Sequence, residues 1–480
     1  MVTEGGLAEI VGATNVSADP AALAAYAADM SFVGARTPRF VVKVDGLETI
    51  QKLVRLAKET GTGLVPVSSG GPHFYGDTVP SAGDAVIVEM SGMKKVDLID
   101  PFERVASMIE PGVTFGELIP AVAKEGLRLN MPLQPRATKS VVGSMLSREP
   151  VIMPHYHWDI SDPIGSTEVV FGTGDMFRTG AAAGPGDIAE QRKGGGVQKE
   201  AAGPSATSLH RMLQGAQGTM GIVTWASARC ELIPDREQPY FLASSDLAKL
   251  LEAAHWLVRL RLGNELLILN RVDLAALIAA DDAAYAKLLL QLPSWVLFFN
   301  LGAYKYFPDM RMDGLIQDTQ ELVQRLGMKT AQNLGGIGAQ EFLESIRRPS
   351  AEPYWKLRRG GAVQDIFFVT TYAKIPGQVK AMTEVVEAAG YAPAKMGIYL
   401  QPIVQGTICH VEFNLFYDPS DPAETEIVRR LATATIQPLT SAGAFFSRPF
   451  GEAARQIMNR DAASVEALKK FPSLIPPRKT

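Results

Sequence analysis

The hydrophobic and polar positions in the first part of the chain alternate between strand-like and helix-like spacing. Residues 39–44 (RFVVKV) form a short β-rich run, and apolar residues then recur at helical spacing over 47–54. Asp45 and Glu48 have the spacing of a capping box at the start of this helix, and Gly61 is placed to end it. The pattern therefore predicts a strand, a helix and then a second strand at 64–67 (LVPV).

The same reading continues to about residue 234. Strands are predicted at 85–90, 104–112 and 220–234, a helix from Thr114 to Lys124 with a second capping box at Glu117, and a hairpin at 168–180. Residues 179–208 are rich in Gly, Ala and Pro and have no sustained period. We predict a long loop there, of the kind that is usually functional or mobile.

The pattern changes near residue 243, where glycine-rich turns become rare. Helices are predicted at 245–262, 310–326, 377–389 and 422–436, and strands at 295–306, 365–373, 395–403 and 409–418. This alternation favours an α+β unit with an antiparallel sheet covered by helices on one face. Residues 442–471 are predicted to be helical.

Length and composition limit the possible classes of protein. A chain of 480 residues exceeds one typical core, so at least two domains are expected. The net charge of −4 argues against nucleic-acid binding, and two cysteines, Cys230 and Cys409, exclude a disulfide scaffold and a Cys-rich metal or iron–sulfur site. No apolar run is long enough to span a bilayer and the first residues lack a signal-peptide pattern, so we expect a cytoplasmic protein.

Four stretches place Gly, Ser or Thr at the end of a predicted strand: 66–76 (PVSSGGPHFYG), 109–118 (IEPGVTFGEL), 136–146 (RATKSVVGSML) and 214–224 (QGAQGTMGIVT). Such residues let the backbone approach a ligand closely and present N–H donors to an anion. In order and spacing, the stretches resemble the FAD-binding domain of the vanillyl-alcohol oxidase / p-cresol methylhydroxylase family, from about residue 35 to 235.

This resemblance implies a fold and a cofactor. The fold expected is α+β: an FAD-binding domain of two αβ subdomains over residues 1–242, a cap domain with an antiparallel sheet over 243–435, and a C-terminal segment over 436–480 that returns to the first domain. The resemblance implies that loop 66–76 clamps the FAD diphosphate. The cofactor-binding residues so implied are Pro66, Ser68, Ser69, Gly70, Gly71, Pro72, His73, Gly76, Pro111, Gly112, Val113, Ser140, Val142, Gly143, Ser144, Gly218, Gly221, Ile222 and Val223.

Attachment of the cofactor is a separate question. Some family members carry a flavin-linked histidine in the clamp loop, and in this chain Pro72 occupies that position while His73 follows one residue later. We therefore expect non-covalent FAD. Other members attach FAD through a residue of the cap, and His410 lies in the strand that corresponds.

The candidate catalytic residues come from two stretches. Residues 153–163 (MPHYHWDISDP) hold two of the six histidines, and the resemblance places this stretch near the flavin. Histidine is suited to accept a substrate proton near neutral pH. The second stretch is AFFSRPFG, whose arginine the resemblance places near a substrate phenolate or carboxylate. The candidates are His155, Tyr156, His157, Asp159 and Arg448, with Arg136 and Lys139 as weaker ones.

The function expected is oxidation of an aromatic alcohol or a 4-alkylphenol by hydride transfer to flavin N5. A 2-hydroxy-acid dehydrogenase of the glycolate or lactate type is the alternative within the same class. A non-catalytic flavin subunit that carries electrons within a complex is the alternative from another class. The electrons would pass to oxygen or to an acceptor protein. The partners expected are therefore a small-molecule substrate, such an acceptor, and further subunits in an oligomer. No metal is expected.

Overall fold

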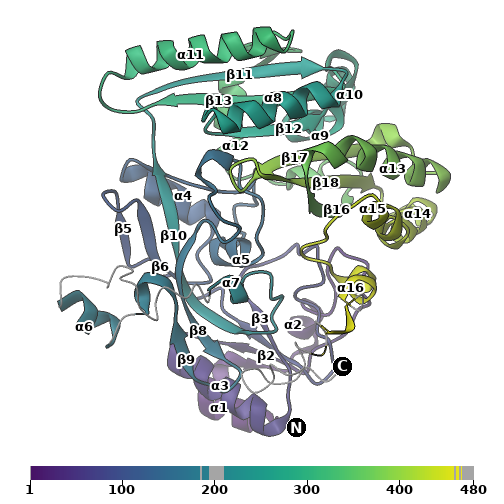
Figure 1. The fold of residues 1–480 in the computed structure, drawn as a ribbon. Helices are drawn as coiled ribbons and strands as arrows, with labels where there is room; N and C mark the ends of the chain where they lie inside the picture. Colours follow the sequence, from purple (N-terminus) through teal and green to yellow (C-terminus); the bar gives the residue numbers. More distant parts are fainter. Residues whose placement is uncertain (1, 184–185, 194–209, 459–460, 464–465, 467–480) are drawn as a thin grey trace.

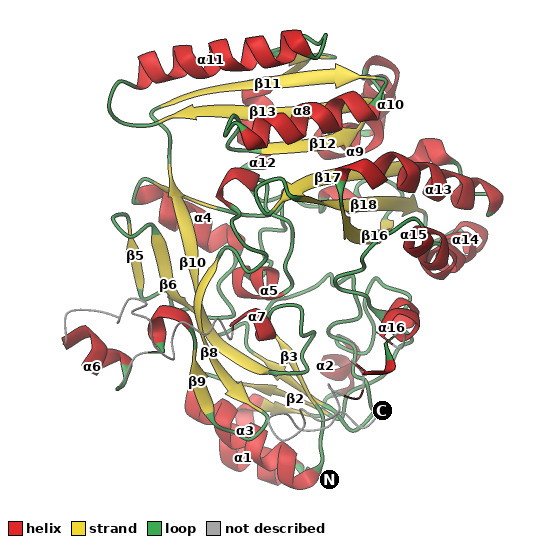
Figure 2. Cartoon of the chain, viewed as in Figure 1, coloured by secondary structure: helices red, strands yellow, loops and turns green. Residues whose placement is uncertain are grey.

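A computed structural model describes residues 2–183, 186–193, 210–458, 461–463 and 466. Three sheets dominate the chain (Figures 1 and 2). The first two lie in the N-terminal half and the third in the C-terminal half. Most of the predicted loop at 179–208 and most of the chain beyond residue 458 fall outside the described residues. Among the described helices, none has the length and apolar character that a bilayer crossing requires.

The first sheet has the strand order β1-β2-β4-β3, formed by β1 (Val16–Ser17), β2 (Phe40–Lys43), β4 (Val86–Glu89) and β3 (Leu64–Val67). The pairs β2–β4 and β3–β4 are parallel. Helices α1 (Glu4–Val11) and α3 (Leu47–Thr60) bury one face of this sheet, and α2 (Pro20–Ala24) lies between β1 and β2 in sequence. Loop 68–81 leaves the end of β3, so the fold places the predicted clamp at the carboxyl edge of parallel strands.

The second sheet is antiparallel and is built around the long strand β10. It contains β5 (Leu98–Asp100), β6 (Val105–Ile109), β10 (Gly221–Leu232), β8 (Ile164–Phe171) and β9 (Met176–Arg178), and β7 (Leu127–Leu129) pairs with β10. Helices α4 (Phe115–Lys124) and α5 (Val141–Leu146) pack on it. The short helices α6 (Ile188–Lys193) and α7 (His210–Leu213) belong to the same half.

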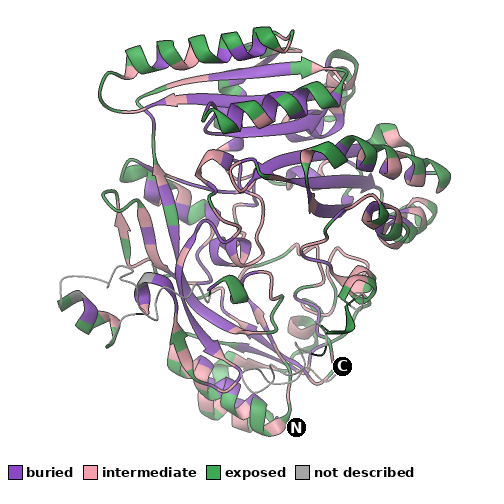
Figure 3. Cartoon of the chain, in the orientation of Figure 1, coloured by how far each residue is buried: buried purple, intermediate pink, exposed green. Residues whose placement is uncertain are grey.

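The third sheet is antiparallel, with the order β11-β13-β12-β17-β18-β16. Its strands are β11 (Arg236–Ser244), β13 (Trp295–Ala303), β12 (Leu266–Asn270), β17 (Met396–Ile403), β18 (Ile408–Tyr417) and β16 (Ala362–Thr370). Most of their residues are buried, as Figure 3 shows. This sheet confirms the predicted α+β class.

Helices cover both faces of the third sheet, so the prediction of helices on one face is wrong. One core contains residues from α8 (Leu247–Arg259), α11 (Pro308–Arg325), α13 (Ile375–Ala388), α14 (Pro422–Ala434) and α15 (Ile436–Ser441). The core on the opposite face contains residues from α9 (Arg271–Ile278) and α12 (Ala339–Ile346), with α10 (Asp282–Gln291) packed at its edge. A small hairpin, β14 (Asn333–Leu334) and β15 (Ile337–Gly338), precedes α12. Alternation along β13 explains both cores, because Val296 and Phe298 face one of them while Leu297 and Phe299 face the other.

Two local expectations differ from the structure. Helix α3 has Gly46 as its N-cap with no side-chain cap bond, and Asp45 instead accepts a hydrogen bond from the Thr49 hydroxyl (2.8 Å). The predicted helix at 442–471 begins only at α16 (Gly451–Met458), because Phe445 bridges to Val369 on β16. A domain boundary at 242/243 would cut β11, so we propose the boundary at residues 233–235. The capping box of α4 at Thr114 and Glu117 is confirmed.

Candidate functional site

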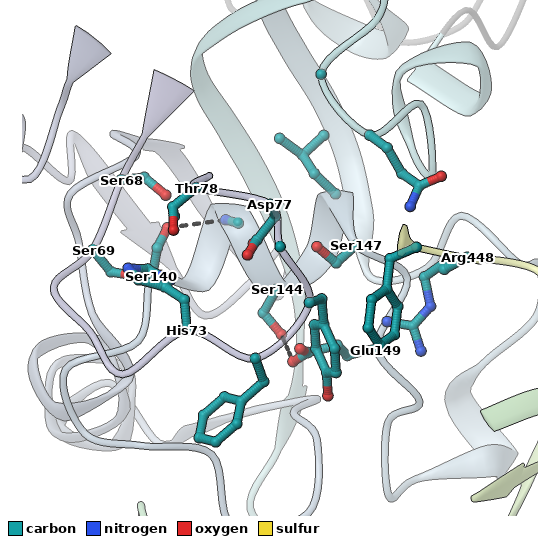
Figure 4. Close-up of a pocket in the computed structure, with 18 of the residues that line it drawn as sticks. Ser68, Ser69, His73, Asp77, Thr78, Ser140, Ser144, Ser147, Glu149 and Arg448 are labelled. Carbon is teal, nitrogen blue, oxygen red and sulfur yellow. Dashed lines mark hydrogen bonds between the residues drawn. The ribbon is translucent and has the colours of Figure 1, made fainter. Parts of the chain in front are cut away.

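A cavity of about 1030 Å³ lies between the N-terminal sheets and the third sheet. The clamp loop, residues 132–150 and residues 213–223 line it from the N-terminal half. Side chains from the third sheet and from the segment before α16 line the rest. Figure 4 shows Ser68, Ser69 and His73 on one side of it and Glu149 and Arg448 on the other. The size is at the upper end of the range for ligand sites, and it suits a large cofactor together with a small substrate.

The clamp loop is held in place by three hydrogen bonds to two other segments. Arg136 donates a hydrogen bond to the Gly70 carbonyl (3.1 Å), Met30 N–H to the His73 carbonyl (2.8 Å), and Gly76 N–H to the Asp29 carboxylate (2.6 Å). Gly76 has φ +66°, and a Cβ there would lie 2.5 Å from Val33, so only glycine fits this end of the loop.

The tip of the loop carries backbone donors that have no partner among the described residues, and Ser69 at its start lines the cavity. Within the described part of the chain, the N–H groups of Ser69, Gly70 and Gly71 donate no hydrogen bond to another residue. A Cβ on Gly70 would have no neighbour within 4 Å, and one on Gly71 would meet only His73 at 3.7 Å. Consecutive unpaired N–H groups beside open space are the donor set that a diphosphate requires. The residues present therefore fit the diphosphate of FAD.

Helix α5 supports the clamp from the other side. Ser140 caps this helix by accepting a hydrogen bond from Gly143 N–H (2.9 Å), and it donates to the Pro111 carbonyl (2.5 Å). A Cβ on Gly143 would lie 3.1 Å from the Ser68 hydroxyl oxygen, so the small residue lets helix and clamp approach each other. The first turn of α5 adds its partial positive charge to the same region.

Most residues that the family resemblance assigned to FAD line this cavity, namely Pro66, Ser68, Ser69, Pro72, His73, Gly76, Pro111, Ser140, Val142, Gly143, Ser144, Gly218, Gly221, Ile222 and Val223. Five do not: Gly70, Gly71, Gly112, Val113 and His410. A Cβ on Gly112 would lie 2.4 Å from the Ser91 carbonyl oxygen, so this glycine serves backbone packing. His410 is fully buried, beneath the Phe367 ring and within 3.3 Å of Glu412.

The weaker candidates Arg136 and Lys139 also line the cavity. Lys139 forms an ion pair with the buried carboxylate of Glu149, which also accepts a hydrogen bond from the Ser144 hydroxyl (2.6 Å; Figure 4). Burial alone would raise the pKa of Glu149, but Lys139 lowers it overall. Glu149 is therefore an ionised wall residue whose charge is already neutralised.

The third sheet brings a buried ionic cluster to the opposite end of the cavity. Lys356 donates to Asp365 (2.8 Å) and to Glu412 (2.5 Å), and the Tyr75 hydroxyl also donates to Asp365 (3.0 Å). Asn414 donates to both carboxylates, at 2.7 and 2.8 Å. We call these five residues the Lys356 cluster. Their neighbours in the cavity wall are aromatic: Tyr354, Trp355, Phe367 and Tyr399.

The two carboxylates of the Lys356 cluster differ in acidity. Burial raises the pKa of Asp365 despite the attraction of Lys356. Burial would raise the pKa of Glu412 as well, but Lys356 and His410 lower it well below its usual range. The ammonium of Lys356 is kept charged because Asp365 and Glu412 raise its pKa against the effect of burial. The cluster therefore holds one firmly ionised carboxylate and one that takes up a proton more readily.

Arg448 lies between the Lys356 cluster and α16. Its guanidinium stacks over the Phe367 ring (4.4 Å to the centroid), and its side chain is 8% exposed. Its Nε is buried and has no hydrogen-bond partner among the residues that the structure describes. A buried, unpaired guanidinium beside a cavity is a site for an anionic group.

His155, Tyr156, His157 and Asp159, which the resemblance places near the flavin, do not line this cavity. His157 accepts a hydrogen bond from Val404 N–H (2.7 Å), and the Tyr156 hydroxyl bonds that of Tyr304 (2.7 Å). His155 stacks on Tyr156, and burial together with Arg261 lowers its pKa to about 4. Asp159 pairs with Arg211 (2.9 Å). The stretch forms a short 3₁₀ turn at Pro154–Tyr156, and His157 directly after it is bound by the β17–β18 turn.

The Lys356 cluster and Glu149 were not predicted from the sequence. A usable signal was present, because Asp365 and Glu412 each interrupt a strongly apolar strand (VQDIFFV and CHVEFNLFY). A charged residue in a buried strand must be paired, and pairing at a cavity points to function.

Comparison with known proteins agrees with this geometry. Residues 38–180 match the family described as FAD binding domain. The chain is 26% identical over 253 residues to the 4-cresol dehydrogenase [hydroxylating] flavoprotein subunit of Pseudomonas putida, which covers 52% of this chain and 46% of that protein. It is 24% identical over 350 residues to the mitochondrial D-lactate dehydrogenase [cytochrome] of Arabidopsis thaliana, covering 72% and 53%.

The fold has a close counterpart among solved structures. A crystal structure of p-cresol methylhydroxylase with substrate bound superposes with a TM-score of 0.81 at 20% identity, over 99% of this chain and 95% of that one. By sequence, the chain spans only about half the length of the two curated relatives. The predicted resemblance to the vanillyl-alcohol oxidase / p-cresol methylhydroxylase type of FAD-binding protein is confirmed, and with it the FAD cofactor.

Proposed function

We propose that this chain, which carries an FAD-binding domain of the p-cresol methylhydroxylase type, is an FAD-dependent oxidoreductase acting on an aromatic alcohol or a 4-alkylphenol. The observation that carries the proposal is the position of the Lys356 cluster. It lies in an aromatic wall, across the same cavity from a clamp fit for a diphosphate. Aromatic walls with a few fixed polar groups are typical of sites that orient a small ring-containing substrate.

FAD would be held by the clamp loop, by α5 and by residues 217–223. When bound, FAD supplies a flavin ring that accepts a hydride at N5. The remaining tasks belong to the chain: the substrate must be oriented, water excluded, and the proton of its hydroxyl group removed. The side chains opposite the clamp are placed for these tasks.

Asp365 is the proton acceptor that we propose. Its raised pKa brings it closer to working pH than Glu412, and a base is most effective when its pKa lies near that pH. Lys356 and Asn414 fix the orientation of its carboxylate, and Tyr75 links it to the clamp loop. Glu412 stays ionised and balances Lys356. Because Asp365 acts only when ionised, kcat/KM should rise with pH through its raised pKa.

Arg448 would bind the phenolate of the substrate. The same guanidinium could bind a carboxylate, so its unpaired Nε also supports the second candidate, a 2-hydroxy-acid dehydrogenase. The electrons would then pass to oxygen or to an acceptor protein. The Pseudomonas putida relative is named a flavoprotein subunit, which supports an acceptor protein as the partner.

The test is anaerobic reduction of the purified yellow protein. The visible flavin absorbance should be lost with 4-hydroxybenzyl alcohol or 4-ethylphenol and persist with glycolate and D-lactate. Loss with the hydroxy acids alone would replace the first candidate by the second. If none of these compounds reduces the yellow protein, the remaining hypothesis is a non-catalytic electron-transfer subunit.

Two matched variants test the role of Asp365. Asp365→Asn should retain FAD and slow reduction by about 10²–10⁴-fold, the usual contribution of a positioned base. Asp313→Asn, an exposed change on α11, should leave the rate unchanged. Equal rates in the two variants would remove Asp365 from the mechanism.

A further inference from the structure

A second cavity of about 350 Å³ lies directly behind the wall that carries Arg448. Val33, Asp365, Phe367, Arg448 and Phe450 line both cavities. Its remaining walls come from Phe32, from α14 and α15, and from the start of α16. We call it the outer chamber. Its lining is therefore continuous with that of the main cavity.

The partition between the two cavities is made of aromatic rings and one irregular segment. Phe367 and Phe450 stack at 6.4 Å, and Tyr75 contacts both rings, at 5.5 and 5.3 Å. Residues 446–450 belong to no helix or strand. They are tied at one end by the Phe445–Val369 bridge and at the other by a hydrogen bond from Gln217 to the Pro449 carbonyl (2.8 Å).

The outer chamber is largely apolar, and among the described residues that line it Arg448 is the cation without a hydrogen-bond partner. Asp365, which also lines it, is held by Lys356, Tyr75 and Asn414. Phe32, Ile436 and Phe446 give it apolar walls. Two of its arginines are paired locally, Arg429 with Glu426 (2.7 Å) and Arg455 with Glu452 (3.3 Å). Arg448 has its buried Nε without a partner among the described residues. A ligand that satisfies these walls has an apolar body and one negative charge.

We propose that the outer chamber is a second ligand site, in series with the main cavity, that houses the apolar part of an anionic substrate while Arg448 binds its charge. This inference rests on the proposed function, since it takes the main cavity as the place of oxidation. It specifies the substrate class: an aromatic or branched apolar compound that extends beyond one ring and carries a carboxylate or a phenolate. Arg448 is then the residue at which the two sites meet.

The experiment uses the holoprotein and titration calorimetry with 1-naphthoate, an anion with two fused rings. Ala432 lines the outer chamber from α14, whereas Ala434 on the same helix is exposed and lines neither cavity. Ala432→Trp places an indole in the chamber and should weaken 1-naphthoate binding about tenfold or more. Ala434→Trp is the matched control and should bind 1-naphthoate as the parent does. Both variants should keep their FAD, because neither residue touches the clamp.

The role of charge is tested with neutral 1-naphthalenemethanol. Arg448→Gln should weaken 1-naphthoate binding by about ten- to hundredfold, the value of a charge-assisted hydrogen bond, and change binding of the neutral compound much less. Equal affinity for 1-naphthoate in Ala432→Trp and Ala434→Trp, or no binding by the parent, overturns the chamber. If 1-naphthoate binding is weakened by Ala432→Trp but no alcohol or phenol reduces the flavin, the second ligand site is supported and the proposed function is refuted.

Discussion

Glu265 joins the two halves of the molecule, and its replacement by glutamine should cost about 3 kcal/mol of stability at pH 7. The side chain is 1% exposed and accepts hydrogen bonds from Arg128 (2.6 Å), Arg347 (2.8 Å) and Asn300 (2.9 Å). Arg128 belongs to β7 of the second sheet, whereas Glu265 precedes β12 of the third sheet and Arg347 follows α12, which packs on the third sheet. Glu265→Gln keeps the shape of this junction and removes its central negative charge.

The magnitude follows from the pKa of Glu265. Burial alone would raise it, but Arg128 and Arg347 lower it from 4.5 to about 2. At 1.36 kcal/mol per unit, this depression corresponds to roughly 3 kcal/mol. The folded state favours the ionised form, so this stability is present above about pH 4.5 and is lost as the pH falls from there towards 2. Breaking a buried ion pair typically costs about 3–5 kcal/mol, which agrees.

The assay is urea unfolding followed by tryptophan fluorescence, at fixed FAD concentration, at pH 7 and at pH 3. Glu265→Gln should lose about 3 kcal/mol at pH 7 and clearly less at pH 3, because the parent has by then lost part of the same contribution. The control is Glu321→Gln, which breaks an exposed pair with Arg325 on α11 and should cost about 0.3–0.5 kcal/mol. A loss at pH 7 no larger than that of the control, or equal losses at both pH values, would refute the reasoning.

Three further predictions concern the cofactor and the stretch PHYHWD. Gly71→Val should abolish FAD binding while the protein still folds, since a Cβ there meets only His73 at 3.7 Å. The control is Gly83→Val, at an exposed glycine between β3 and β4, which should keep FAD. The measurement is the flavin content per chain. Acid precipitation should release the yellow colour into the supernatant, and a flavin-labelled peptide containing His410 would contradict non-covalent binding. His157→Ala should lose its bond to Val404 and about 1–2 kcal/mol of stability, while anaerobic reduction proceeds at the parent rate. A rate loss of about 10²-fold with FAD retained would instead indicate that the histidine acts as a base.

The proposed cofactor half of the site could be described from the sequence because its chemistry is local. A diphosphate clamp uses consecutive backbone N–H groups, so Ser69, Gly70 and Gly71 appear together in the sequence as they do in space. The capping residues of α4 and the left-handed Gly61 at the end of α3 are local in the same sense. Each of these features depends on residues only a few positions apart.

The proposed substrate half could not be predicted in this way, because its residues meet only through tertiary structure. Tyr75 and Asp365 are 290 positions apart and joined by one hydrogen bond. The direction of PHYHWD also depends on a distant partner, since His157 is held by the turn between β17 and β18. The histidine-rich stretch near the cofactor motifs connects the two halves through His157 and Val404, and its catalytic role stays a prediction.

The register of one strand pair explains why the Lys356 cluster forms where it does. In the antiparallel pair of β16 and β18, Asp365 is opposite Asn414 and Phe367 is opposite Glu412. Because side chains alternate along a strand, these four residues share one face of the sheet with His410, while Ile366 and Phe413 point into the core on the other face. A shift of one residue in the register would exchange these two sets and bury the carboxylates against α13 and α14. The apolar core beneath the third sheet therefore fixes the position of the charged residues that face the cavity.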